Sequence, residues 1–161
     1  MCSSGPMPKL KPLVQWYCDT CGEVIEKADD GWVEWVWKDR TNSGFRIVHH
    51  VGALPDGRTC QRNRRTEGLA DRGLKDFLGS YGQSLLLCML DDGEIADPKH
   101  TRPLSVDIRE WLILFRRLNT PYYEEARLYM SKAKSDGYYN DWNQAAVFKD
   151  ESLLELIKEY E

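Results

Sequence analysis

The chain has 161 residues, of which 42% are hydrophobic, enough to form the core of one domain or of a small module joined to an ordinary domain. Its 22 basic and 26 acidic side chains give a formal net charge of −4, which excludes the overall polycation of a general nucleic-acid binder. No apolar run approaches the roughly 18 residues of a membrane span, and no signal peptide is apparent. We therefore expect a cytoplasmic protein that makes no contact with a membrane, with residues 1–11 as a flexible leader.

The first chemical motif is a Cys-x-x-Cys knuckle at Cys18 and Cys21. Residues 15–17 predict a short strand that delivers the first cysteine, and Gly22 tolerates the positive φ that such a knuckle often requires. The five cysteines of the chain are odd in number and unevenly spread, which favours a metal site over a disulfide framework. On the motif alone, a redox dithiol remains the alternative.

Two runs of strand-forming residues, 32–37 and 45–51, flank a polar loop over 38–44 and predict a β-hairpin. Alternation along the second strand places His49 and His50 on opposite faces, so only one of them readily points at a metal ion. The same alternation turns at least one tryptophan of the first strand outward, where it would contact the helical part or another chain.

A turn signal at residues 55–57 brings the chain back to Cys60. The predicted metal ligands are Cys18, Cys21, His50 and Cys60, with His49 as the alternate for the third position. Because four protein ligands leave no position for water, the ion is predicted to be a structural Zn²⁺. Its binding would stabilise the module by about 10 kcal/mol.

With these residues, the stretch 16–60 resembles a zinc ribbon or a related zinc finger at the level of a broad superfamily. Such ribbons usually complete the tetrahedron with a second Cys-x-x-Cys, where this chain has a histidine followed by Cys60. The resemblance implies a zinc-binding β-module, to which we assign residues 12–66. It implies no activity for the remainder of the chain.

The strand that ends in His49 and His50 also resembles the HNH type of metal-dependent nuclease. In that type one histidine activates water while others hold a catalytic ion, and further Asn and His residues follow on a helix. Residues 69–90 contain neither Asn nor His. A nuclease that uses His49 and His50 is therefore kept only as the alternative function.

A basic stretch follows the last predicted ligand and contains Arg62, Arg64 and Arg65, with Arg58 just before it. Beside a metal knuckle, such a cluster can bind phosphate, as in nucleic-acid-binding zinc ribbons. The alternative is a solvated linker that pairs with the acidic second half of the chain. The candidate partners are accordingly a protein or a nucleic acid, and the sequence gives no oligomeric state.

From residue 67 onward the hydrophobic period is helical and predicts an α-helical domain of about four helices over 67–161. The run 85–90 is apolar all round, which predicts a central helix buried on every side, with Cys88 in the core. Later helices are expected to begin at Ser105, at Thr120-Pro121 and at Ser152.

Two adjacent carboxylates, Glu124 and Glu125, fall in a predicted first helical turn, where they favourably oppose the helix dipole. Neighbours at i and i+1 point apart, so they do not form an acid–base pair. With no convincing catalytic constellation, the sequence predicts an α+β fold in which a small zinc-bound β-hairpin module precedes a helical domain. The predicted function is that of a non-enzymatic intracellular adaptor.

Overall fold

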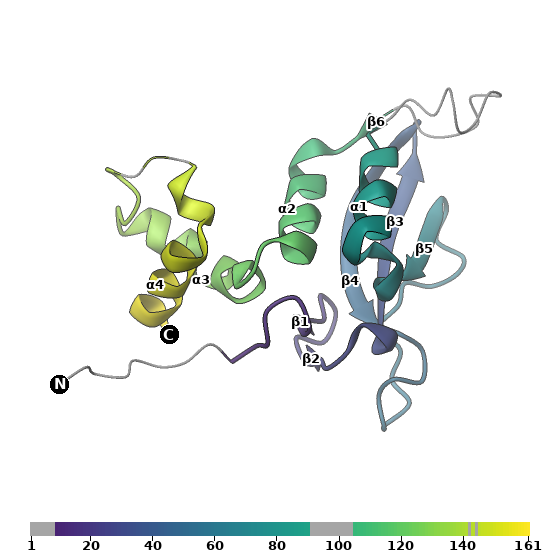
Figure 1. Cartoon of the computed structure of the whole chain (residues 1–161). Helices are drawn as coiled ribbons and strands as arrows, with labels where there is room; N and C mark the ends of the chain where they lie inside the picture. The colour runs from purple at the N-terminus through teal and green to yellow at the C-terminus, as the bar shows by residue number, and fades with distance from the viewer. Residues whose placement is uncertain (1–8, 91–104, 142, 144) are drawn as a thin grey trace.

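The computed structural model describes residues 9–90, 105–141, 143 and 145–161, and within them the fold is α+β, as predicted. The strands are β1 (Trp16–Tyr17), β2 (Val24–Ile25), β3 (Gly31–Lys38), β4 (Thr41–His49), β5 (Leu69–Gly73) and β6 (Ser105–Val106). The helices are α1 (Gly79–Cys88), α2 (Ile108–Asn119), α3 (Tyr123–Ser135) and α4 (Asp150–Tyr160). In Figure 1, α1 and α2 lie along the larger sheet, and α3 and α4 form a separate pair beside them. Most of the expected leader lies outside the described residues.

The expected hairpin is present as the antiparallel pair β3 and β4, with Val33 opposite Ile47 and both fully buried. The loop is shorter than expected, because the strands extend to a tight turn at Asp39 and Arg40, where φ is 51° and 60°. Such a turn matches the twist of the flanking strands. The register shifts between Glu34 and Val36, and beyond that bulge the side chain of Trp37 is 45% exposed.

The larger sheet has the order β5-β3-β4-β6, and its edge strands were not anticipated. The expected helical character from residue 67 is wrong over Leu69–Gly73, which pairs antiparallel with β3. This segment has no β-branched or aromatic residue, so its strand conformation comes from pairing with its neighbour rather than from local propensity. At the other edge, Ser105 pairs with Thr41 in a parallel bridge and does not cap a helix.

The positions at which three helices begin also differ from expectation. Asp107 caps α2 by accepting hydrogen bonds from the backbone of Arg109 and Glu110. Helix α3 begins at Tyr123, after Tyr122 has adopted a φ of 63°, and α4 begins at Asp150, two residues before the expected Ser152. Local cap patterns identified these helices but misplaced their first turns by a few residues, the usual uncertainty of helix ends.

Helix α1 is not buried on every side. Leu86 is fully buried against the sheet, whereas Leu87 is 57% exposed and Leu90, just beyond the helix, is 42% exposed. Cys88 is also exposed, so its expected place in the core is wrong. An apolar run signals burial, but here the helix covers one face of a sheet, and none of the described residues covers its outer side.

The buried apolar side chains of the described residues form two hydrophobic clusters. The larger one joins residues from both sides of position 66, the expected module boundary, and includes Trp16 and Cys60 before it and Phe77 and Trp111 after it. The second lies within α3 and α4, around Leu153 and its neighbours. Among the described residues, no helix has the length and apolar character needed to cross a membrane.

Candidate metal centre

The two knuckle cysteines are held by the small sheet of β1 and β2. Cys18 follows β1 directly, and its N–H donates to the carbonyl of Glu23 at 2.9 Å while its own carbonyl accepts from Gly22 at 2.9 Å. Gly22 has a φ of 76°, as the tight knuckle requires. The N–H of Thr20 lies 3.4 Å from the sulfur of Cys18. These bonds shape the knuckle, and within it the sulfurs of Cys18 and Cys21 lie within 4.8 Å of each other.

The other two donors come from the end of β4 and from the loop after it. His49 is the last residue of β4 and is 4% exposed, and Cys60 is 3% exposed. The hydroxyl of Thr20, within the knuckle, donates to the carbonyl of Cys60 at 2.7 Å. This bond fixes the loop to the knuckle.

The four side chains Cys18, Cys21, His49 and Cys60 form a cluster that can hold a metal ion, because their ligand atoms all lie within 4.8 Å of one another. Nδ1 of His49 is 3.5 Å from the sulfur of Cys21 and 4.0 Å from that of Cys60. A tetrahedral zinc site, with bonds of about 2.0–2.1 Å to nitrogen and 2.3 Å to sulfur, has sulfur–nitrogen edges of about 3.5 Å and sulfur–sulfur edges of about 3.8 Å. The cluster therefore has dimensions close to those of a zinc site.

The orientation of the His49 ring also suits a ligand. Nε2 lies 3.3 Å from the carbonyl of Val24, to which it donates in the tautomer that carries its proton there. That tautomer leaves the lone pair of Nδ1 facing the sulfurs. A backbone carbonyl that holds the non-coordinating nitrogen is a common support for a metal-binding histidine.

The thiols of the cluster differ in acidity. Burial acts to raise the pKa of Cys18, but hydrogen bonds from the backbone of Cys21 and Thr20 and from His49 outweigh it and lower the pKa to about 7. Burial, with hydrogen bonds to Cys18 and Cys21, raises the pKa of Cys60 to about 12. Cys18 therefore ionises more readily than Cys60, and a bound cation would favour the thiolate form of both.

The structure brings His49 to the sulfurs and not His50, which the sequence had favoured as the third ligand. The ring of His50 stacks on Trp32 instead, with centroids 5.2 Å apart and an interplanar angle of 17°. The reason lies in where the knuckle packs. Asp19 exchanges two hydrogen bonds with the backbone of Ile47, one through its own backbone and one through its side chain, so the knuckle lies along the edge of β4 near His49. His49 is buried there, whereas His50 is half-buried and lies against Trp32.

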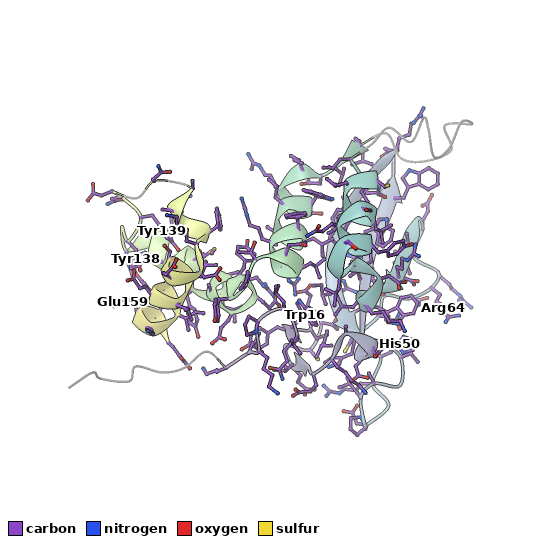
Figure 2. All side chains as sticks on the ribbon, in the orientation of Figure 1. Trp16, His50, Arg64, Tyr138, Tyr139 and Glu159 are labelled. Atoms are coloured by element: carbon purple, nitrogen blue, oxygen red, sulfur yellow. The ribbon has the colours of Figure 1, made fainter. Side chains whose placement is uncertain are left out.

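The four arginines of the basic stretch do not form one surface. Arg58 bonds both carboxylate oxygens of Glu23 at 2.9 Å, and Arg62 donates to the carbonyl of Gly44 at 2.8 Å. Arg64 and Arg65 are exposed, and their side chains form no ion pair with the described residues. In Figure 2, Arg64 lies at the same end of the molecule as His50.

A buried ion-pair network, which no sequence pattern indicated, joins the candidate metal centre to the helical part of the chain. Arg117 of α2, 4% exposed, contacts Glu124 at 2.6 Å and Asp19, inside the knuckle, at 2.6 Å. Arg127 contacts both carboxylates as well, and the N–H of Tyr17 donates to Glu124 at 3.0 Å. The carboxylate of Glu125 accepts from the backbone of residues 9 and 10. The acidic pair therefore has a structural role.

Comparisons with protein-family models, with curated proteins and with solved structures found no match to this chain. The likeness to zinc-binding folds consequently depends on the cluster of three cysteines and one histidine alone.

Proposed function

We propose that the chain is a zinc-stabilised adaptor in which the ion has a structural and not a catalytic role. The observation that carries this proposal is the convergence of four protein donors from three separate segments on one point. Because a tetrahedral zinc ion with four protein ligands has no open position for water or substrate, it neither activates a nucleophile nor polarises a carbonyl. The zinc ion instead contributes to the free energy of folding.

The partner-binding surface that we favour is next to the centre and is formed by Trp32 and His50. Their stacked rings border a surface pocket of about 330 Å³ that Gln61, Arg64 and Asp71 also line. Tryptophan and arginine contribute most often to the binding energy of protein interfaces, and this surface carries charges of both signs. A protein partner is therefore the first candidate.

Nucleic acid is the second candidate, supported by the exposure of Arg64 and Arg65. The other two arginines are engaged with Glu23 and Gly44, which leaves a small basic surface for phosphate. The alternative of an HNH-like nuclease is not favoured, because the cluster has no open coordination position and His50 lies against Trp32.

Titration with labelled single- and double-stranded DNA and RNA at several salt concentrations separates the two partners. If the natural partner is a protein, we expect that this chain does not bind the labelled nucleic acids in a saturable way. A nucleic-acid partner would instead give binding that weakens steeply with salt and falls at least fivefold in Arg64→Ala/Arg65→Ala. The matched control is Arg109→Ala/Lys134→Ala, which removes the same charge from exposed positions of α2 and α3.

Two further measurements complete the test. Affinity purification from the native host should recover a partner that is lost in Trp32→Ala and retained in the charge control. Divalent-ion-dependent cleavage of DNA or RNA that disappears in His50→Ala, a variant expected to stay folded, would contradict the adaptor role and establish a nuclease instead.

A further inference from the structure

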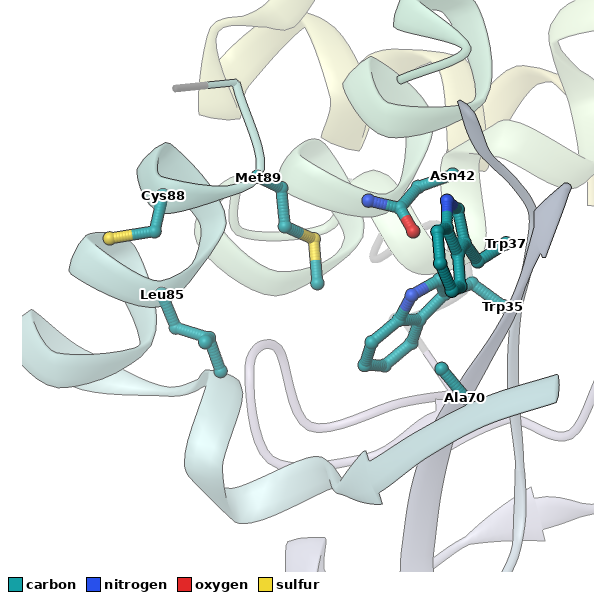
Figure 3. A pocket seen from close by; sticks show the side chains of 7 residues that line it. All are labelled: Trp35, Trp37, Asn42, Ala70, Leu85, Cys88 and Met89. Atoms are coloured by element: carbon teal, nitrogen blue, oxygen red, sulfur yellow. The ribbon is translucent and has the colours of Figure 1, made fainter. Parts of the chain in front are cut away.

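A pocket of about 280 Å³ lies between β3 and α1, apart from the metal centre. Trp35 and Trp37 form one wall, and Leu85 and Met89 face them from the helix, as Figure 3 shows. The lining also includes Ala70, Cys88 and Asn42. The volume is slightly below that of pockets for drug-sized ligands, so a molecule of two fused rings is of suitable size.

The walls favour a flat aromatic occupant. An indole offers a large, rigid face on which another ring stacks, and the thioether of a methionine makes favourable contacts with ring edges. Trp37 is 45% exposed at this site, and Cys88 is exposed at its margin. The pocket is therefore open to a molecule from solution.

One polar side chain interrupts this apolar lining. Asn42 is only 6% exposed, and its side-chain oxygen is buried with no hydrogen-bond partner among the described residues. The backbone carbonyl of Asn42 accepts from the N–H of Asp107 at 2.8 Å. Figure 3 shows the amide at the end of the pocket, between Met89 and Trp37.

An unpaired buried carboxamide destabilises a fold, and an apolar side chain of the same shape would remove that cost. Function is a reason to keep such a group, because a ligand can supply the missing partners. A carboxamide presents a donor next to an acceptor, so its complement is a ring edge that carries an acceptor next to a donor.

We propose that this pocket binds a small planar heteroaromatic molecule whose edge, with a hydrogen-bond donor beside an acceptor, pairs with Asn42 while its ring contacts Trp35 and Trp37. The pairing fixes the orientation of the ligand, and the indoles supply contact area. Binding does not involve the metal ion, so it is independent of the proposed function.

The probe is isoquinolin-1-one, a two-ring lactam whose N–H and carbonyl complement a carboxamide, and its N-methyl derivative is the matched control because it lacks the donor. By calorimetry or NMR titration, the lactam should bind the intact protein at least tenfold more tightly than its N-methyl derivative. Bound lactam should also slow the alkylation of Cys88 by iodoacetamide.

The decisive variant is Asn42→Leu, which replaces the amide by an apolar group of similar shape. It should bind the lactam at least tenfold more weakly, lose the preference over the N-methyl derivative, and have a melting temperature equal to or above that of the original protein. A second variant, Ala70→Leu, fills the pocket and should abolish binding of both probes while the chain stays folded.

Equal binding of the two probes to the intact protein would overturn the proposal. So would lactam binding that is unchanged in Asn42→Leu, or a lower melting temperature of that variant, since the amide would then have a structural partner.

Discussion

Replacing His49 by alanine is expected to abolish stoichiometric zinc binding and to unfold the N-terminal part of the chain, whereas replacing His50 leaves both intact. His49 contributes the fourth donor of the cluster, and a structural zinc ion contributes about 10 kcal/mol or more to folding. This is comparable with the whole stability of a typical domain. His50→Ala removes one stacked ring at a half-buried position, at a cost of about 1 kcal/mol.

The two histidines are neighbours in sequence, so each variant is the control for the other. Zinc content after dialysis and the thermal unfolding midpoint give the comparison. A third variant, His49→Cys, tests whether the lost function is coordination, because four cysteines also form a competent structural site. It should retain zinc better than His49→Ala. Zinc loss in His50→Ala with retention in His49→Ala would reverse the assignment.

Replacing Arg117 by methionine should destabilise the protein by about 3 kcal/mol, because Glu124 and Asp19 then keep only Arg127, which is partly exposed, as a cation partner. Burial acts to lower the pKa of this guanidinium, but the two carboxylates outweigh burial and raise the pKa above its usual value. The charge is therefore present throughout the accessible pH range. The expected loss is measured as the change in free energy of unfolding in urea.

Two variants make this prediction specific. Arg109→Met removes an exposed arginine from the same helix and should change the free energy of unfolding by less than about 0.5 kcal/mol. In Arg117→Met/Glu124→Leu the carboxylate is removed too, and the double variant should be less destabilised than the sum of its single changes. Additive effects would show that the two side chains are not coupled in the folded state.

The features that the sequence predicted correctly have strong local signals. The hairpin follows from runs of tryptophan, valine and isoleucine, and α2 from apolar residues at helical spacing. The cysteine–histidine cluster follows from the limited set of residue types that bind zinc. Each of these inferences needs only neighbouring residues or a short list of possible ligands.

The errors occurred where a residue's state depends on distant partners. Alternation separated His49 from His50, but the choice between them required knowing that Asp19 binds the backbone of Ile47 and so holds the knuckle beside that end of β4. Strand β5 forms only because β3 offers an open edge. The acidic residues of α3 were expected only to oppose the helix dipole, since the partner of Glu124, Arg117, is on another helix and Glu125 binds the backbone of residues 9 and 10.

The exposure of Cys88 has a similar origin. An apolar run of six residues indicates burial, but it does not reveal which side of the helix meets the sheet. Leu86 packs inward, while Leu87 and Cys88 remain at the surface, where Cys88 also lines the pocket of Asn42. Here the departure from the expected pattern coincides with a candidate binding site, as departures from local rules often do.

The central claim is that one zinc ion is bound by three sulfurs and one imidazole nitrogen. X-ray absorption at the zinc edge, on protein purified without added metal and analysed for metal content, tests it most directly. We predict one zinc per chain, with three sulfur neighbours at about 2.3 Å and one nitrogen at about 2.0 Å. A preparation that is folded and contains no stoichiometric metal, or a zinc ion with a water ligand, would contradict the structural role that we assign to it.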